Sequence, residues 1–130
     1  MKKKSDPRHK MRVQAVKSLF EKSFRPDHQI AKTEIAGQVI TKQKEIDNLI
    51  AKYAPAWPLE QIAPVDLATL RLAVWELFFR KTKEPYKVVI DEAVEIAKEY
   101  SSASSASFVN GVLGSIIKSK VKVESQKQEP

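Results

Sequence analysis

Apolar residues recur at intervals of three or four positions along most of the chain, and this spacing predicts α-helices. In the first predicted helix, Asp6 and Pro7 are typical of a helix start. Pro26 marks its end, because the residue before a proline is pushed out of helical geometry. A second helix is predicted over Thr33–Tyr53. Lys42 interrupts its apolar stripe, so we expect this side chain to turn outward to solvent.

Three more helices are predicted in the second half of the chain. The segment from Pro64 to about Arg80 is apolar on nearly every side, which is typical of a helix at the centre of a bundle. Residues 86–100 have apolar stripes on one side and acidic side chains on the other. The small-residue linker Ser101–Ser107 is expected to cap the last helix, and Trp57, between two prolines, to anchor the corner before Pro64.

These elements predict an all-α fold, a compact helical bundle in a single domain over residues 1–130. A basic arm over residues 1–6 and a polar tail over residues 120–130 are expected to be flexible. No apolar run approaches the roughly 18 residues of a membrane span, and the charged start lacks the apolar segment of a signal peptide. The absence of cysteine excludes disulfides and thiolate chemistry, and it fits a cytoplasmic protein.

The positive charge of the chain is concentrated at its two ends. The formal net charge is +7, but residues 13–116 contain equal numbers of acidic and basic residues. Residues 1–12 hold six basic residues and one acidic residue. Basic side chains in a first helical turn oppose the helix dipole, so their repetition suggests that they bind an anion such as nucleic-acid phosphate. A solvated basic arm that aids solubility is the alternative. The side chains concerned are Lys3, Lys4, Arg8, Lys10, Arg12 and Lys17.

Catalysis and metal binding have little support in the sequence. The acidic residues Asp91, Glu92, Glu95 and Glu99 lie at helical spacing, but such a row is typical of a hydrated helix face. Two histidines do not make a usual multi-histidine metal site, so no metal site and no cofactor are predicted. Two glycines inside the last predicted helix indicate close approach of another helix, a backbone or a bound chain, and packing is the simplest of these interpretations.

Four sequence blocks together resemble the NusB family of bacterial transcription antitermination factors. The most specific is FVNGVL at residues 108–113. The segment AVKSLF at 15–20 resembles the family's first helix, LRLAVWEL at 70–77 a middle helix, and PYKVVIDEAVEIAK at 85–98 the helix after it. The resemblance extends over about residues 8–118, nearly the whole chain.

The resemblance implies an all-α NusB-type fold without enzymatic activity or cofactor. It implies binding to boxA-type RNA of ribosomal operon leaders, together with the ribosomal protein NusE. Other Nus factors and RNA polymerase would complete the antitermination complex. By position, the family's arginine-rich helix start falls on Arg8, Lys10 and Arg12. Further RNA contacts fall on Ser104, Ser107, Phe108, Asn110 and Gly111, and the NusE surface on Asp66, Tyr86 and Lys87.

The chain departs from the family pattern in several places. Gly114 and Ser104 stand where the family usually has aspartate, and Lys17 replaces a glutamine. These changes should strengthen phosphate binding at the expense of base discrimination. Only eight residues separate Phe24 from Thr33, so the family's second helix is expected to be shortened or absent. Two alternative functions stay open: an RNA-binding accessory domain related to ribosomal-RNA methyltransferases, and a helical scaffold that binds only protein.

Overall fold

The computed structural model describes the backbone of residues 6–54 and 56–127, and side chains as far as residue 122. These residues form six α-helices and one 3-10 helix, with no strand among them, which confirms the predicted all-α fold. In chain order the elements are α1 (Pro7–Phe24), α2 (Ile35–Thr41), α3 (Gln43–Tyr53), η1 (Leu59–Gln61), α4 (Pro64–Phe78), α5 (Tyr86–Tyr100) and α6 (Ala103–Lys127). In the described ranges, no helix is both long enough and apolar enough to cross a membrane.

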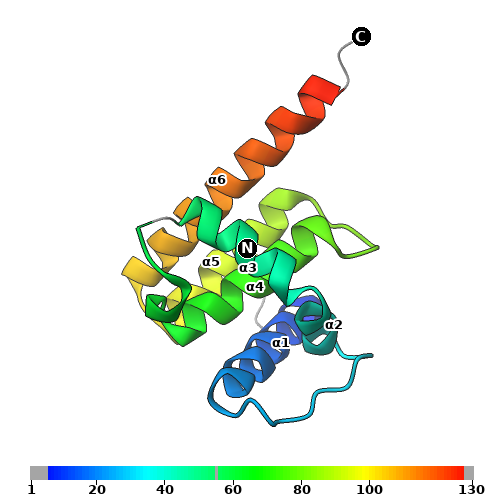
Figure 1. Ribbon diagram of the computed structural model, residues 1–130, viewed down its shortest axis with the longest axis vertical. Helices are drawn as coiled ribbons and strands as arrows, with labels where there is room; N and C mark the ends of the chain where they lie inside the picture. Colours follow the sequence, from blue (N-terminus) through cyan, green and yellow to red (C-terminus); the bar gives the residue numbers. More distant parts are fainter. Residues whose placement is uncertain (1–5, 55, 128–130) are drawn as a thin grey trace.

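Helix α4 is the centre of the bundle, as its apolar sequence predicted. It contacts each of the other five α-helices, which surround it in Figure 1. Ten of its fifteen residues are buried, and three of these, Asp66, Thr69 and Glu76, are polar or charged. Because the centre of the bundle contains charged side chains, those groups need partners from the surrounding helices.

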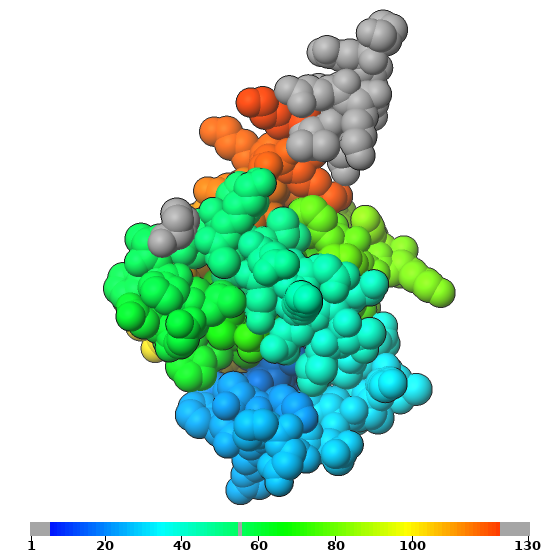
Figure 2. Space-filling model, in the orientation of Figure 1, coloured from blue at the N-terminus to red at the C-terminus, as the bar shows by residue number. Residues whose placement is uncertain are grey.

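Helix α1 begins and ends where the sequence predicted. The backbone N–H of Arg8 donates a hydrogen bond to Oδ1 of Asp6 at 2.8 Å, so Asp6 is the N-cap. The chain leaves the helix at Arg25, before Pro26. Residues 25–34 form turns without a helix, as the short spacing in the sequence indicated. In Figure 2, α1 and the connection that follows it lie together at one end of the molecule.

The predicted helix over Thr33–Tyr53 is wrong, because the structure has two helices there. Helix α2 starts after Glu34, and the helix is interrupted at Lys42 before α3 begins. In one continuous helix, Lys42 would lie on the buried face between Val39 and Ile46, both fully buried. The break leaves Lys42 exposed, as expected, and places its Nζ 5.5 Å from the ring centre of Phe79.

The last helix is longer at both ends than the sequence suggested. Only Ser101 and Ser102 separate α5 from α6, so most of the predicted linker lies inside the helix. Ser102 provides the expected cap, since its Oγ accepts a hydrogen bond from the backbone N–H of Ser105 at 3.0 Å. The helix then continues to Lys127, through much of the segment predicted to fray, and its C-terminal part projects from the bundle (Figure 1).

Trp57 does not anchor the corner before α4. Trp57 is 52% exposed, whereas Trp75 in α4 is buried. The prolines on either side of Trp57 keep it out of a regular helix, so it lies in a loop. The exposure of its side chain therefore depends on the position of that loop relative to α6. This loop and the start of α6 form one wall each of the pocket described below.

Candidate nucleic-acid interface

The predicted basic residues of the N-terminal segment have different environments. Lys3 and Lys4 lie outside the described residues. Lys10 and Lys17 are exposed on α1, and the side chain of Arg8 is 68% exposed. Nε of Arg8 lies 3.7 Å from Oδ1 of Asp6, and its Nη1 lies 3.7 Å from Oε2 of Glu84. Ion pairs made by such an exposed side chain are weak. These side chains are therefore accessible to an anion.

Arg12 is the exception: the structure buries this side chain, which does not fit the RNA contact predicted for it. Its side chain is only 5% exposed. Nε and Nη2 each donate to a carboxylate oxygen of Glu76 at 2.9 Å. Nη2 also donates to Glu84 at 2.7 Å, and Nη1 to Glu92 at 3.2 Å. We call Arg12, Glu76, Glu84 and Glu92 the ion cluster. An arginine held by three carboxylates inside the bundle is not available to RNA phosphates.

The charge state of Arg12 follows from two opposing effects. Burial lowers the pKa of its guanidinium, but the hydrogen bonds and charge of Glu76, with the charges of Glu84 and Glu92, outweigh burial and raise the pKa above its usual value. Arg12 is therefore a permanent cation inside the protein. Glu76, which is buried, also accepts from Nη1 of Arg80 at 2.9 Å, four residues further along the chain.

The acidic row of α5 is not uniformly hydrated, contrary to the sequence prediction. Asp91 and Glu99 are exposed, but Glu92 is buried. Its Oε1 lies 3.3 Å from Nδ1 of His9. Possible ligand atoms of His9, Glu92 and Glu95 lie within 4.8 Å of one another. Because Arg12 already brings a positive charge to Glu92, we interpret this group as part of the ionic packing between α1 and α5.

Two contacts show how α1 runs along α5. His9 lies beside Glu92, and Nζ of Lys17 lies 5.6 Å from the ring centre of Tyr100. The pairs 9–92 and 17–100 have the same offset in sequence, so the two helices run in the same direction over two turns. Tyr100 is the last residue of α5, and only two residues separate it from the start of α6. The basic side of α1 therefore leads from Lys10, past Lys17, to the start of α6.

The start of α6 presents the other residues predicted to contact RNA. Ser104, Ser107 and Gly111 are exposed and, with the half-buried Phe108, occur at spacings of three and four along one side of the helix. Asn110 is also exposed. Ser104 and Ser107 lie inside α6, where the sequence predicted a linker.

Neither glycine of α6 is needed for packing, which corrects the prediction from the sequence. A Cβ at Gly111 or Gly114 would meet no described atom within 4 Å. The helix backbone is therefore open at Gly111, on the side of α6 that carries Ser104 and Ser107.

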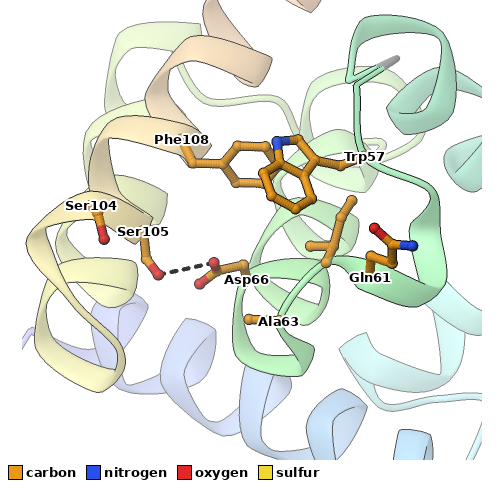
Figure 3. A pocket seen from close by; sticks show the side chains of 8 residues that line it. Trp57, Gln61, Ala63, Asp66, Ser104, Ser105 and Phe108 are labelled. Atoms are coloured by element: carbon orange, nitrogen blue, oxygen red, sulfur yellow. Dashed lines mark hydrogen bonds between the residues drawn. The ribbon is translucent and has the colours of Figure 1, made fainter.

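A pocket of about 350 Å³ lies between the loop before α4 and the first two turns of α6. Trp57, Gln61 and Asp66 line one side, and Ser104, Ser105 and Phe108 the other; all six are labelled in Figure 3. Oγ of Ser105 donates a hydrogen bond to Oδ2 of Asp66 at 2.9 Å. We call this the Asp66 pocket. Trp57, Gln61 and Ser105 were not predicted as site residues, because their proximity to Asp66 depends on the tertiary fold.

The three residues predicted to contact NusE do not form one patch. Tyr86 and Lys87 are exposed in the first turn of α5, but Asp66 is 6% exposed in the first turn of α4. Helix α5 follows α4 through a short turn and packs against it in the opposite direction (Figure 1). Asp66 and Tyr86 are therefore separated by most of the length of α4, roughly 18 Å at 1.5 Å per residue. Instead, Asp66 lies with Ser104 and Phe108.

Comparisons with known proteins agree with this architecture. A family model described as "NusB family" matches residues 4–118. The transcription antitermination protein NusB of Herpetosiphon aurantiacus is 36% identical over 130 aligned residues, which cover 85% of this chain and 89% of that protein. The NusB of Acetivibrio thermocellus is 46% identical over 88 residues, covering 68% of this chain and 60% of its own length.

Solved structures give the same assignment. The structure of T. maritima NusB matches with a TM-score of 0.77 at 36% identity, covering 87% of this chain and 92% of that chain. A chain from the structure of the antitermination factors NusB and NusE in complex with dsRNA matches with a TM-score of 0.74 at 25% identity, covering 86% of this chain and 96% of that chain. The protein described here belongs to the NusB family.

Proposed function

We propose that this chain is a transcription antitermination factor that binds RNA together with a NusE-type ribosomal protein. The proposal rests on its family membership and on a related structure, described as NusB and NusE in complex with dsRNA. The proposed RNA is of the boxA type found in ribosomal operon leaders. The proposed complex includes other Nus factors and RNA polymerase, which requires a cytoplasmic location. No enzymatic step and no cofactor is part of this function.

One observation carries the RNA-binding part of the proposal. The exposed Lys10 and Lys17 lie along the side of α1 that ends at Tyr100, next to the start of α6. An RNA backbone that follows these two lysines reaches the exposed side of α6 at Ser104 and Ser107. Phosphate contacts fix the position of the strand, and side chains at the start of α6 contact the bases. We propose that Lys3 and Lys4, which lie outside the described residues, add further phosphate contacts.

The test compares exposed basic residues on α1 with exposed basic residues on α3. Arg8→Ala combined with Lys10→Ala should weaken binding to boxA-type RNA and reduce the slope of log affinity against log salt by about 1.4, roughly 0.7 per lost contact with single-stranded RNA. Lys44→Ala combined with Lys52→Ala removes the same charge from α3 and is the matched control. Filter binding over a range of salt concentrations measures both quantities. Equal affinity and slope for the two double variants would refute the placement of RNA along α1.

The NusE part needs its own measurement. Tyr86→Ala and Lys87→Ala change exposed side chains in the first turn of α5, so they should weaken co-purification with a NusE-type protein without unfolding the chain. Unchanged NusE binding in both variants would move the partner surface elsewhere. A chain that binds NusE but no RNA, under any salt condition, would support the protein-only scaffold instead.

A further inference from the structure

The Asp66 pocket contains a buried carboxylate whose hydrogen bonds are incomplete. Asp66 is 6% exposed, and its Oδ2 accepts from Ser105. No described residue donates a hydrogen bond to Oδ1, which is itself buried. A buried carboxylate oxygen without a donor is costly, and native proteins rarely retain one without a reason. The position of Asp66 in the first turn of α4 favours its negative charge but supplies no hydrogen bond to Oδ1.

The rest of the pocket suits a flat aromatic ligand. Trp57 is half exposed and Phe108 is half buried, and both rings project into the same space in Figure 3. Stacking on an aromatic side chain is the usual way in which proteins bind an unpaired base, and it is worth about 1–3 kcal/mol per base. The amide of Gln61 and the hydroxyl of Ser104 offer further neutral hydrogen-bonding groups.

From this geometry we infer that the Asp66 pocket binds one unpaired guanine base of the RNA, with the Asp66 carboxylate accepting hydrogen bonds from the base edge. This inference rests on the proposed RNA-binding function. Guanine is the base that presents two adjacent donors, N1–H and the N2 amine, on its Watson–Crick edge. Adenine and cytosine place a ring-nitrogen lone pair beside their amine, and uracil flanks its single donor with two carbonyl oxygens. Those lone pairs would face the negative carboxylate.

A positively charged protein side chain could also reach a carboxylate beside an indole. The charge of this chain disfavours that occupant, because the net charge is +7 and Lys17 lies against Tyr100, next to the start of α6. The same charges attract the RNA backbone that would deliver a neutral base. The observations therefore favour RNA over a cationic peptide.

The experiment compares three labelled oligouridines that carry a single central guanosine, inosine or adenosine. Binding is measured by fluorescence anisotropy with the full chain, alone and with an equimolar NusE-type partner. We expect guanosine to bind about 5- to 150-fold more tightly than adenosine, the range of a good bidentate contact, with inosine between them because it lacks the N2 amine. Asp66→Asn presents an amide N–H₂ to the pocket and should abolish or reverse this preference. Asp91→Asn, on the exposed side of α5, is the matched control and should keep it.

A second measurement does not depend on the folding of the Asp66 variant. The guanosine oligonucleotide should quench the indole fluorescence of the wild-type chain more than the adenosine oligonucleotide does, and Trp57→Phe should remove that difference. Trp75 is buried and supplies the constant background.

The outcomes separate the inference from the proposed function. Equal binding of all three oligonucleotides, or a guanosine preference that survives Asp66→Asn in a folded protein, would overturn the guanine pocket and leave RNA binding intact. Quenching of Trp57 by an arginine-containing peptide but not by guanosine RNA would overturn it in favour of a protein ligand. No binding to any RNA, including a boxA sequence, with or without the partner, would overturn both.

Discussion

Replacing Arg12 should destabilise the protein far more than replacing any exposed basic residue of the same helix. The side chain is 5% exposed, and its partners Glu76 and Glu92 are 3% and 2% exposed. In Arg12→Ala, both carboxylates remain inside the bundle without the guanidinium that they share. Removing one partner of a buried ion pair costs about 3–5 kcal/mol, because the remaining charge keeps its desolvation penalty. That is a large fraction of the roughly 5–15 kcal/mol that stabilises a typical domain.

Urea denaturation followed by far-UV circular dichroism measures this loss. With a dependence on urea of about 2 kcal/mol per molar, the midpoint should fall by roughly 1.5–2.5 M. Arg8→Ala, one turn earlier in the same helix, is the control, and it should change stability by less than about 0.5 kcal/mol because Arg8 is exposed. Arg12→Lys should recover little, since an ammonium group cannot form the paired hydrogen bonds to Glu76.

A compensated variant tests the mechanism itself. Arg12→Met combined with Glu76→Gln and Glu92→Gln removes the cation and the two most buried carboxylates together. If the loss comes from buried carboxylates that lack the guanidinium, the triple variant should be more stable than Arg12→Ala. An Arg12→Ala protein with the wild-type urea midpoint would refute the assignment of Arg12 to the interior. A triple variant less stable than Arg12→Ala would show that packing, rather than charge, sets the loss.

Two further predictions concern glycine packing and helix capping. Gly37→Ala should lower the free energy of unfolding by about 1–3 kcal/mol, because its Cβ would lie 2.0 Å from the backbone oxygen of Ala31. Gly111→Ala should raise the free energy of unfolding by about 0.5–1 kcal/mol, because its Cβ meets open space. Thermal melts of both variants measure these changes. The pKa of Asp6 is lowered, chiefly by the backbone N–H of Arg8, so its stabilising effect is present above the usual aspartate pKa and is lost as pH falls through the lowered value. Asp6→Asn keeps a cap that does not titrate. The free energy of unfolding of both proteins is measured as a function of pH, and two curves that stay parallel through acid pH would contradict this effect.

The parts of the fold that local rules determine were predictable from the sequence. Asp6 and Pro7 define the start of α1, and the apolar segment after Pro64 becomes the central helix. The break at Lys42 was not predicted, because a lysine in an apolar stripe can also extend outward from a continuous helix. Only the packing of α2 and α3 against the rest of the bundle distinguishes the two solutions.

The candidate site was less predictable, because its key contacts join residues far apart in sequence. Arg12 meets Glu76 and Glu92 across 64 and 80 positions, and no periodicity in a single helix reveals that pairing. The exposure of Trp57 has the same origin, since the loop that carries it packs against the start of α6. Residue type and spacing identified a basic helix and a signature helix correctly, but they did not separate the side chains that contact solvent from those that face the core.

The basic start of α1 therefore combines two functions that its sequence alone does not distinguish. Its inner side binds α4 and α5 through the ion cluster, and its outer side carries Lys10 and Lys17 toward the start of α6. Glu84 lies near both sides, because it accepts from Arg12 and lies 3.7 Å from Arg8. The buried carboxylates also offset the unfavourable interaction of these cations with the helix dipole. A loss of RNA binding after mutation of this segment consequently has two possible physical origins. Only variants whose stability is measured alongside their affinity can assign a residue to the RNA surface.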